Sequence, residues 1–302
     1  MLKSALITIG VPVYNEEKNI RGTLESILNQ NYKDILVCVS DNCSTDNTYN
    51  IIEEISKRDD RVKIWRQERN IGPFDNFKFV LDKATTKYFM WVGGHDTITS
   101  TYLQEAISHL EKYNETAAVY PKAITYEGST EVSMTDNFFV EPPTFFNKII
   151  KIIKTCSNGS AFHSVFRTSV LKNSFLDLNG GDLYLFLRVA LYGNFVQTQS
   201  NAYIMKQVKS SETNAERDLR YVKVGFKPNW REIHSMYPFT VIAEYNGLSL
   251  FKKLNLFIIV RDLMVKYRDN SWPTVTFYFL KQAKLKCSLL AFLAGIKSVI
   301  RK

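Results

Sequence analysis

The sequence has 302 residues, 45% hydrophobic and 23% charged, which argues against a disordered chain and suits one large globular domain or one domain with an appendage. The formal net charge of +9 lies in the segment from Gly247 to Lys302, where eleven basic residues accompany Asp262 and Asp269, so the rest of the chain is neutral overall. The four cysteines form no C-x-x-C pair and have no zinc-ligand spacing, which indicates free thiols in a reducing compartment.

Four apolar runs rich in β-branched residues predict buried strands at residues 6–13, 35–41, 62–65 and 88–92. Apolar residues at helical spacing predict an amphipathic helix after each strand, with inner faces Ile20-Leu24-Ile27-Leu28, Ile51-Ile52-Ile55, Phe74-Phe77-Leu81-Ala84 and Leu103-Ile107-Leu110. Ser44 and Ser100 are placed to cap two of these helices, and Pro73 suits the first turn of another. The alternation predicts an α/β fold with a mostly parallel central sheet flanked by helices.

The middle of the chain predicts a mixture of strands, at 117–121, 161–166, 195–199 and 202–208, with at least two helices. After about residue 212 the pattern is mainly helical. We therefore expect an α/β domain at residues 1–212 and a helical, basic C-terminal region at residues 213–302. The longest apolar run of that region, CSLLAFLAGI, is shorter than the ~20 residues that a membrane-spanning helix needs.

Polar clusters follow three of the predicted strands: PVYNEE at 12–17, DNCSTDNT at 41–48 and GGHD at 93–96. In an open α/β sheet, ligands bind beyond the carboxyl ends of the strands. Each cluster alone also suits a turn or a helix cap, because Asn, Asp and Ser are common there. Three clusters at the carboxyl ends of the first, second and fourth predicted strands predict a ligand site at one edge of the sheet.

The segment VPVYNEEKNIRGTLESILNQNYKDILVCVSDNCSTDNT resembles the opening of glycosyltransferase family 2, whose usual form is a VPVYN-type strand end, a helix and a DDGSTD-type loop. RNIGPFDN resembles that family's N-x-G segment, and GGHD stands where the family keeps its D-x-D motif. FHSVFRTSVL resembles the acceptor-side strand with its arginine, and GGDLYLFLRVALYG resembles the E-D-x-x-L-x-x-R segment. The resemblance covers about Leu6 to Gln207. It implies a GT-A (Rossmann-like) fold, with a nucleotide-sugar-binding half at 1–120 and an acceptor and catalytic half at 121–212.

The resemblance also implies which residues bind the donor, a nucleotide-diphosphate sugar with UDP as the expected nucleotide. Pro12, Tyr14 and Glu16 would border the nucleotide. Asp41 would accept a hydrogen bond from the nucleobase, since a carboxylate forms short, strong bonds with an N–H edge. Asn70 and Gly72 would let the backbone pass close to the nucleoside.

Two departures from the family pattern affect the metal and the leaving group. The D-x-D motif reads Gly94-His95-Asp96, so Asp96 would be the protein carboxylate on a divalent cation, Mg²⁺ or Mn²⁺. His95 either helps to bind Mn²⁺ or is an ordinary hydrogen-bonding residue. The later loop, MKQVKSSE, lacks the family's histidine, so Lys206 or Lys209 either neutralises the leaving diphosphate or is solvated surface charge.

The family's E-D pair reads Gly181-Asp182, which makes Asp182 the candidate general base of the transfer. Apolar residues at helical spacing follow Asp182 and place it at the start of a helix. Aspartate is also a favoured N-cap, so the same residue type is expected there for stability alone. As a general base, Asp182 would be needed for the transfer rate, whereas an N-cap could be replaced by asparagine with little effect.

Together these observations predict an inverting glycosyltransferase acting on a saccharide or lipid-linked saccharide, as in bacterial capsule or lipopolysaccharide synthesis. The alternative is a catalytically weakened relative that binds a nucleotide sugar as a partner or scaffold, because carboxylates are missing at Gly94 and Gly181. ITIGVPVYN is not a glycine-rich phosphate loop, which argues against a nucleotidyltransferase. The lack of a convincing second facing carboxylate argues against a glycosidase.

The C-terminal region alternates basic residues with apolar ones, among them Leu254, Phe257, Ile258 and Leu263. This pattern suits a helix lying on an anionic membrane. It equally suits a helical subdomain packed on the body, or a homo-oligomer interface. The apolar residues between the charges favour a membrane or protein surface over nucleic acid. We therefore expect a cytoplasmic protein that can be peripheral on the inner face of the membrane.

Overall fold

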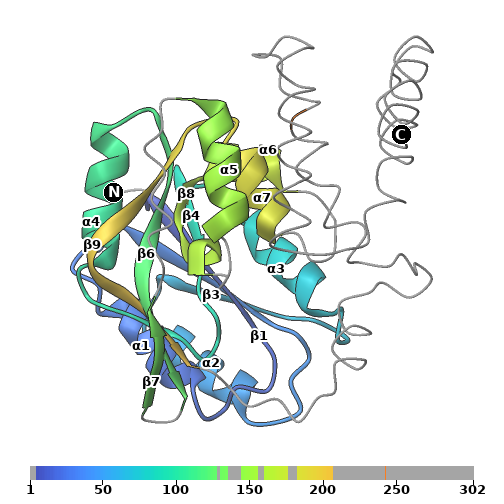
Figure 1. Ribbon diagram of the computed structural model, residues 1–302. Coiled ribbons are helices and arrows are strands. Elements are labelled where there is room, and N and C mark those ends of the chain that lie inside the picture. Colours follow the sequence, from blue (N-terminus) through green and yellow to red (C-terminus); the bar gives the residue numbers. More distant parts are fainter. Residues whose placement is uncertain are drawn as a thin grey trace, which may run out of the picture. The chain divides into compact units, whose positions relative to one another are not determined.

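The computed structural model in Figure 1 describes residues 5–127, 130–134, 144–155, 160–175 and 182–206, together with Ile242. The chain divides into two compact units, Met1–Phe226 and Lys227–Lys302, and all the elements described below belong to the first. Our predicted boundary at 212/213, Lys209 and, apart from Ile242, the basic C-terminal region lie outside the described residues and stay predictions. No helix in the described ranges is long and apolar enough to cross a bilayer.

The first half of the sheet consists of four parallel strands in the order β3-β2-β1-β4. These are β1 (Ile7–Val13), β2 (Ile35–Asp41), β3 (Val62–Arg66) and β4 (Tyr88–Trp91). Helices connect them or follow them: α1 (Ile20–Leu28), α2 (Thr48–Ser56), α3 (Pro73–Asp82) and α4 (Tyr102–Lys112). The predicted strand–helix alternation is confirmed, and Pro73 occupies the first turn of α3 as expected.

Helices cover both faces of this part of the sheet, as the alternation predicted. Ile7, Ile9 and Val11 of β1 are fully buried and belong to one apolar cluster with the inner faces of α1, α2 and α4. Helix α3 packs on β1 and β2 and buries Asn76, Val80 and Leu81. Phe74 and Phe77, which we expected to face inward, are only half-buried. Asn76 takes the inner position because its side chain exchanges hydrogen bonds with Ser40.

The second half of the sheet mixes strand directions and continues the order as β4-β8-β6-β9-β5. Its strands are β5 (Thr97–Ile98), β6 (Thr116–Glu127), β8 (Val165–Arg167) and β9 (Asn194–Lys206), while β7 (Thr130–Met134) pairs with β6. Strand β8 is antiparallel to β4 and β6, whereas β6 and β9 are parallel. The remaining elements are α5 (Phe145–Thr155), the 3₁₀ helix η1 (Ser160–His163), α6 (Thr168–Ser174) and α7 (Asp182–Val189).

Two predicted helix caps are wrong. Ser44 does not cap α2; its hydroxyl accepts a hydrogen bond from the backbone N–H of Asn15, at 2.9 Å. Ser100 does not cap α4 either, because that helix begins at Tyr102 and is preceded by Thr101, without a side-chain cap. The hydroxyl of Ser44 thus serves the loop after β1, whereas Ser100 lies one position before the N-cap residue of α4.

Two predicted strand boundaries are also wrong. Residues 160–163 form η1 before the strand β8 begins, because the amide and the hydroxyl of Ser164 both donate to the carbonyl of Ala161 and close a turn. The strands predicted at 195–199 and 202–208 are one long strand, β9, since it pairs with β6 along its length despite irregularities in the register.

Trp91 is the centre of an aromatic cluster where the two halves of the sheet meet. It is fully buried, and its ring stacks on Phe162 with centroids 4.5 Å apart. Phe89 meets it edge-on at 4.9 Å, and its indole N–H donates to the carbonyl of Phe77 at 3.1 Å. Because Trp91 ends β4, this cluster fixes the start of the GGHD loop that follows.

We expect Trp91→Ala to lower the free energy of unfolding by about 3–5 kcal/mol, because truncating a buried aromatic residue removes its contacts and leaves a cavity. Tyr192→Ala is the control: this side chain is 50% exposed, and surface substitutions usually change stability by less than about 0.5 kcal/mol. Urea unfolding followed by circular dichroism measures both. Equal effects would contradict the central role of Trp91.

Candidate functional site

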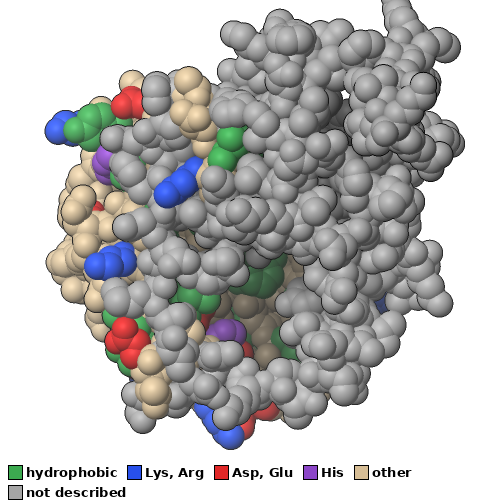
Figure 2. Space-filling model, in the orientation of Figure 1, with side chains coloured by type: hydrophobic (Ala, Val, Ile, Leu, Met, Phe, Trp, Pro, Cys, Tyr) green, Lys and Arg blue, Asp and Glu red, His purple; other side chains and the backbone are tan. Residues whose placement is uncertain are grey.

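The three polar clusters predicted at strand ends do converge. Strands β2 and β4 both pair in parallel with β1, so their carboxyl ends lie at one edge of the sheet. The loop after β1 is hydrogen-bonded to the loop after β2: the N–H of Glu16 donates to the hydroxyl of Thr48 at 2.7 Å, and the side chain of Asn15 accepts from the N–H of Thr45 at 2.9 Å. Figure 2 shows a histidine among the described side chains on one face of the molecule.

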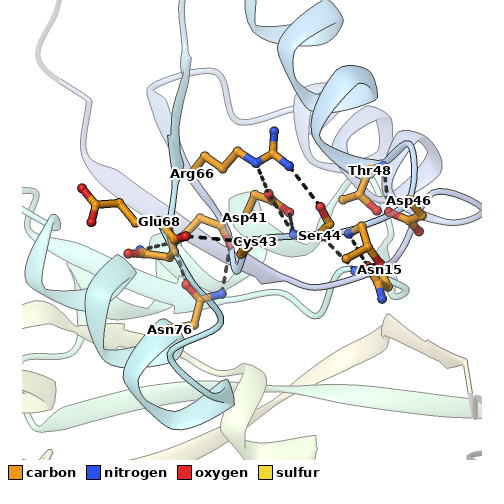
Figure 3. Close-up of polar contacts among 12 residues, drawn as sticks. Asn15, Asp41, Cys43, Ser44, Asp46, Thr48, Arg66, Glu68 and Asn76 are labelled. Atoms are coloured by element: carbon orange, nitrogen blue, oxygen red, sulfur yellow. Dashed lines mark hydrogen bonds and ion pairs between the residues drawn. The ribbon is translucent and has the colours of Figure 1, made fainter.

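Asp41 ends β2 and is almost fully buried, with 1% of its surface exposed. Its carboxylate accepts from the backbone N–H of Ser44, at 3.2 and 3.3 Å for the two oxygens, and lies 3.4 Å from Nε of Arg66 (Figure 3). Arg66 also donates to the carbonyl of Ser44 and lies over the ring of Tyr49, 4.7 Å from its centroid. The Asp41 carboxylate therefore helps to fix the conformation of the loop that follows it. Any ligand that bonds to Asp41 would share the carboxylate oxygens with Ser44 and Arg66.

Cys43, in the same loop, has left-handed backbone with φ 62°, at the position where the DDGSTD pattern has glycine. Left-handed backbone costs a residue that carries a side chain about 1–2 kcal/mol. The surrounding contacts of Ser44 and Asn42 hold the loop in this conformation. Its shape is therefore imposed by the neighbouring segments and not by its own preference.

Asn42 ties the loop after β2 to the segment that precedes α3. It is 2% exposed, and its amide group donates to Oδ1 of Asn70 at 3.0 Å and to the carbonyl of Gly72 at 3.2 Å. Its oxygen accepts from the N–H of Ile71 at 2.9 Å. Gly72 has φ 85°, which favours glycine there. The side-chain amide of Asn42, which both donates and accepts, thus holds Asn70 and Gly72 beside the loop that follows Asp41.

Glu16 and His95 bring the first and third clusters together. Oε1 of Glu16 is 2.8 Å from Nδ1 of His95, and Oε2 accepts from the side-chain amide of Asn19 at 3.0 Å. The hydrogen bond with Glu16 raises the pKa of His95 above its ordinary value, against the opposing effect of burial. The side chains of His95 and Glu16 are 34% and 17% exposed, so both border the surface.

Asp96 is held by a buried network. Its side chain is 4% exposed; Oδ2 accepts from the hydroxyl of Tyr203 at 2.9 Å, and Oδ1 accepts from the backbone N–H of Lys206 at 3.0 Å. Nδ1 of His163 lies 2.9 Å from the Tyr203 hydroxyl and 3.1 Å from the carbonyl of Trp91. Burial lowers the pKa of His163 and raises that of Tyr203 well above its usual value, so both stay neutral beside the carboxylate. The two hydrogen bonds to its oxygens hold the Asp96 side chain in place.

The other predicted site residues differ in where the structure places them. Pro12 is buried within β1, opposite Ser40, whereas Tyr14 projects just beyond the strand and is 44% exposed. Lys206 is exposed at the end of β9 and reaches Asp96 through its backbone only. Asp182 begins α7 as predicted, and its side chain lies outside what the structure describes.

Arg167, the arginine of the FHSVFRTSVL segment, stabilises the end of α4. Its guanidinium donates to the carbonyls of Leu110, Tyr113 and Thr116, at 2.7, 3.0 and 2.8 Å. A cation at the C-terminal end of a helix satisfies carbonyls that have no partner within the helix. These contacts give Arg167 a structural role.

The sequence analysis missed four residues that organise the site: Asn42, Arg66, His163 and Tyr203. Asn42 lies within a motif that we quoted, but its partners are 28–30 residues away. Tyr203 is 107 residues from Asp96, and no local signal connects the two.

Known proteins share both the sequence pattern and the fold of this chain. Residues 8–175 match the family described as Glycosyl transferase family 2. The GalNAc(5)-diNAcBac-PP-undecaprenol beta-1,3-glucosyltransferase of Campylobacter jejuni is 28% identical over 170 residues, 55% of this chain and 53% of that protein. The UDP-Glc:alpha-D-GlcNAc-diphosphoundecaprenol beta-1,3-glucosyltransferase WfgD of Escherichia coli is 26% identical over 209 residues, 69% of this chain and 79% of that protein.

Among solved structures, that of S. aureus TarS 1–349 in complex with UDP-GlcNAc matches with a TM-score of 0.68 and 20% identity, covering 86% of this chain and 73% of that one. This likeness confirms the predicted GT-A fold. The chain spans between 25% and 53% of the length of three curated relatives that it matches.

We expect Asn42→Asp to destabilise the protein by about 1–3 kcal/mol, because a carboxylate cannot donate to Asn70 and Gly72 and leaves buried acceptors without partners. Asn50→Asp is the matched control, since Asn50 is exposed on α2 and its side chain donates to the nearby Asn47. Thermal unfolding of the two variants measures the difference. Equal stability of both variants would show that the Asn42 amide does not hold the loops together.

Proposed function

We propose that this chain, which belongs to glycosyl transferase family 2, transfers a sugar from a nucleotide diphosphate to an acceptor hydroxyl with inversion at the anomeric carbon. The observation that carries the proposal is the convergence of three loops at one sheet edge, with Asp41 on one of them and His95 and Asp96 on another. A nucleobase beside Asp41 and a diphosphate beside Asp96 would use both parts of this edge.

The donor and acceptor classes follow from chemistry and from the relatives. The TarS complex contains UDP-GlcNAc, which supports a UDP-sugar as the donor. Two relatives are named for transfer to undecaprenol-linked saccharides, which supports a lipid-linked saccharide acceptor and a place in bacterial surface-polysaccharide synthesis. Tyr14, exposed in the loop after β1, would offer its ring to the nucleoside.

In the proposed reaction the acceptor oxygen attacks the anomeric carbon opposite the diphosphate. The new C–O bond forms as the bond to the diphosphate oxygen breaks, which inverts the configuration. Asp182 would take the hydroxyl proton as general base. The electron pair leaves with the nucleoside diphosphate, whose charge Lys206 or Lys209 would help to neutralise.

Asp96 and His95 are the residues that would hold a divalent cation. Within the described ranges no three His, Cys, Asp or Glu side chains form a metal-binding group. A cation that also binds substrate phosphates needs only one or two protein carboxylates, so the donor set fits, and the imidazole favours a transition ion such as Mn²⁺ over Mg²⁺. When bound, the cation would stabilise charge on the departing diphosphate.

A catalytically weakened nucleotide-sugar-binding relative is the second candidate. It is favoured by the missing carboxylate at Gly94, where a side chain would meet Val13 and Glu16. Turnover separates the two: release of UDP from a panel of UDP-sugars, with lipid-linked saccharide acceptors and with or without Mn²⁺, supports the enzyme. Nucleotide binding without any turnover supports the weakened relative, and the absence of both overturns the proposed function.

Asp41→Asn should weaken UDP binding by about 1.5–3 kcal/mol, because a neutral amide replaces a charged acceptor. The shift in unfolding temperature on adding UDP measures this, since a ligand of the folded state stabilises it by RT ln(1 + [L]/Kd). Asp82→Asn, a change to an exposed carboxylate at the end of α3, is the control. An unchanged UDP affinity in Asp41→Asn would remove Asp41 from the nucleobase site.

Asp182→Asn should fold normally, bind UDP as before and transfer sugar about 10²–10⁴-fold more slowly, because it loses the proton acceptor. Asn caps helices about as well as Asp, so a residue that only caps α7 would leave the rate nearly intact. Steady-state transfer rates and thermal unfolding of the same preparation distinguish the two roles. Transfer at close to the parent rate would exclude Asp182 as the base.

A further inference from the structure

Residue 94 has no space for a side chain. A Cβ atom placed on Gly94 would lie 2.9 Å from Cγ2 of Val13 and 3.2 Å from Cγ of Glu16. The backbone there is also held, because the buried hydroxyl of Thr23 donates to the carbonyl of Gly94 at 2.9 Å. The family pattern has its first D-x-D aspartate at this position, and in this chain the side chain of Glu16 borders the space that such an aspartate would need.

Glu16 is fixed from three directions. Its N–H donates to the hydroxyl of Thr48, Oε2 accepts from the amide of Asn19, and Oε1 is bonded to His95. Both carboxylate oxygens are therefore engaged by the protein. Of these contacts, the one between Oε1 and Nδ1 of His95 links Glu16 directly to the neighbouring GGHD loop.

The hydrogen bond to Glu16 also determines the tautomer of His95. An ionised carboxylate can only accept a hydrogen bond, so the proton of a neutral imidazole must lie on Nδ1. Nε2 then keeps a free lone pair, 3.8 Å from Oδ1 of Asp96. Asp96 is itself held by Tyr203 and by the N–H of Lys206. Both potential metal ligands, Nε2 of His95 and the Asp96 carboxylate, are therefore oriented by their neighbours.

We propose that Glu16 is a positioning residue that compensates, through His95, for the carboxylate that residue 94 cannot carry. It holds His95 with the proton on Nδ1 and presents Nε2 beside Asp96, as the second protein donor to the divalent cation of the nucleotide sugar. Histidines that ligate metals usually donate their other N–H to such a carboxylate. The inference rests on the proposed function, since it assigns the cation to that site.

The first test is the ¹⁵N NMR spectrum of the imidazoles in metal-free protein, at a pH where His95 is neutral and with its signals assigned by His95→Gln. We expect protonated Nδ1 and unprotonated Nε2 in the parent and in Glu16→Gln, whose amide oxygen can still accept. In Glu16→Ala the two tautomers should mix. A parent spectrum with the proton on Nε2 would overturn the proposal without recourse to any variant.

The second test is the affinity for Mn²⁺ in the presence of UDP, measured from the free Mn²⁺ signal in electron paramagnetic resonance. We expect Glu16→Ala to weaken Mn²⁺ binding about 10–100-fold, as for other supporting partners of metal ligands. Glu17→Ala is the matched control: it removes an equal charge from the same loop, and Glu17 bonds to the N–H of Asn47 and not to His95. Equal Mn²⁺ affinities in both variants, or no binding by the parent, would overturn the proposal.

These measurements do not depend on turnover. Protein that shows the expected tautomer and the expected loss of Mn²⁺ affinity but transfers no sugar would contradict the proposed function alone. If the protein transfers sugar, but replacing Glu16 changes neither the tautomer of His95 nor the affinity for Mn²⁺, this inference alone is contradicted.

Discussion

The parallel pairing of β1 with both β2 and β4 is the constraint on which the rest of the site depends. Parallel neighbours end at the same edge of a sheet, so three loops far apart in sequence must meet there. The connecting helices make this possible, because a parallel crossover needs a dozen or more residues and places its helix on a face of the sheet. The aromatic cluster around Trp91 then joins this half to the mixed-direction half that supplies β8 and β9.

Polar contacts, and not apolar packing, define the geometry of the edge itself. Asp41 and Asp96 are both nearly fully buried, which is unfavourable for a charge unless hydrogen bonds compensate for the lost water. For Asp41 the compensation comes from its own loop and from Arg66, and for Asp96 from Tyr203 and the backbone of β9. Each carboxylate is therefore held rigidly, which suits binding of a donor in one orientation.

The departures from the family pattern have a physical basis in this arrangement. Gly94 replaces a carboxylate where Val13 and Glu16 leave no room, and His95 turns toward Glu16 instead. Cys43 occupies a left-handed position where glycine is usual, and the contacts of its neighbours maintain that conformation. The conformation of each loop thus depends on its contacts with the other loops. Comparing one residue with the family motif therefore says little about the role of its side chain.

The sequence by itself determined the alternation of strands and helices in the first half, the place of Asp182 at the start of a helix and the three polar clusters at strand ends. These follow from apolar periodicity and turn chemistry, which depend on residues close together in the chain. It failed at Ser44, whose hydroxyl bonds to the loop after β1, and at Ser100, which lies one position before the N-cap of α4. It also could not identify Tyr203 or Asn42 as supports of the site. Only the tertiary structure decided those contacts, since sheet pairing brings together residues up to 107 positions apart, and no local pattern encodes which buried polar atoms will meet.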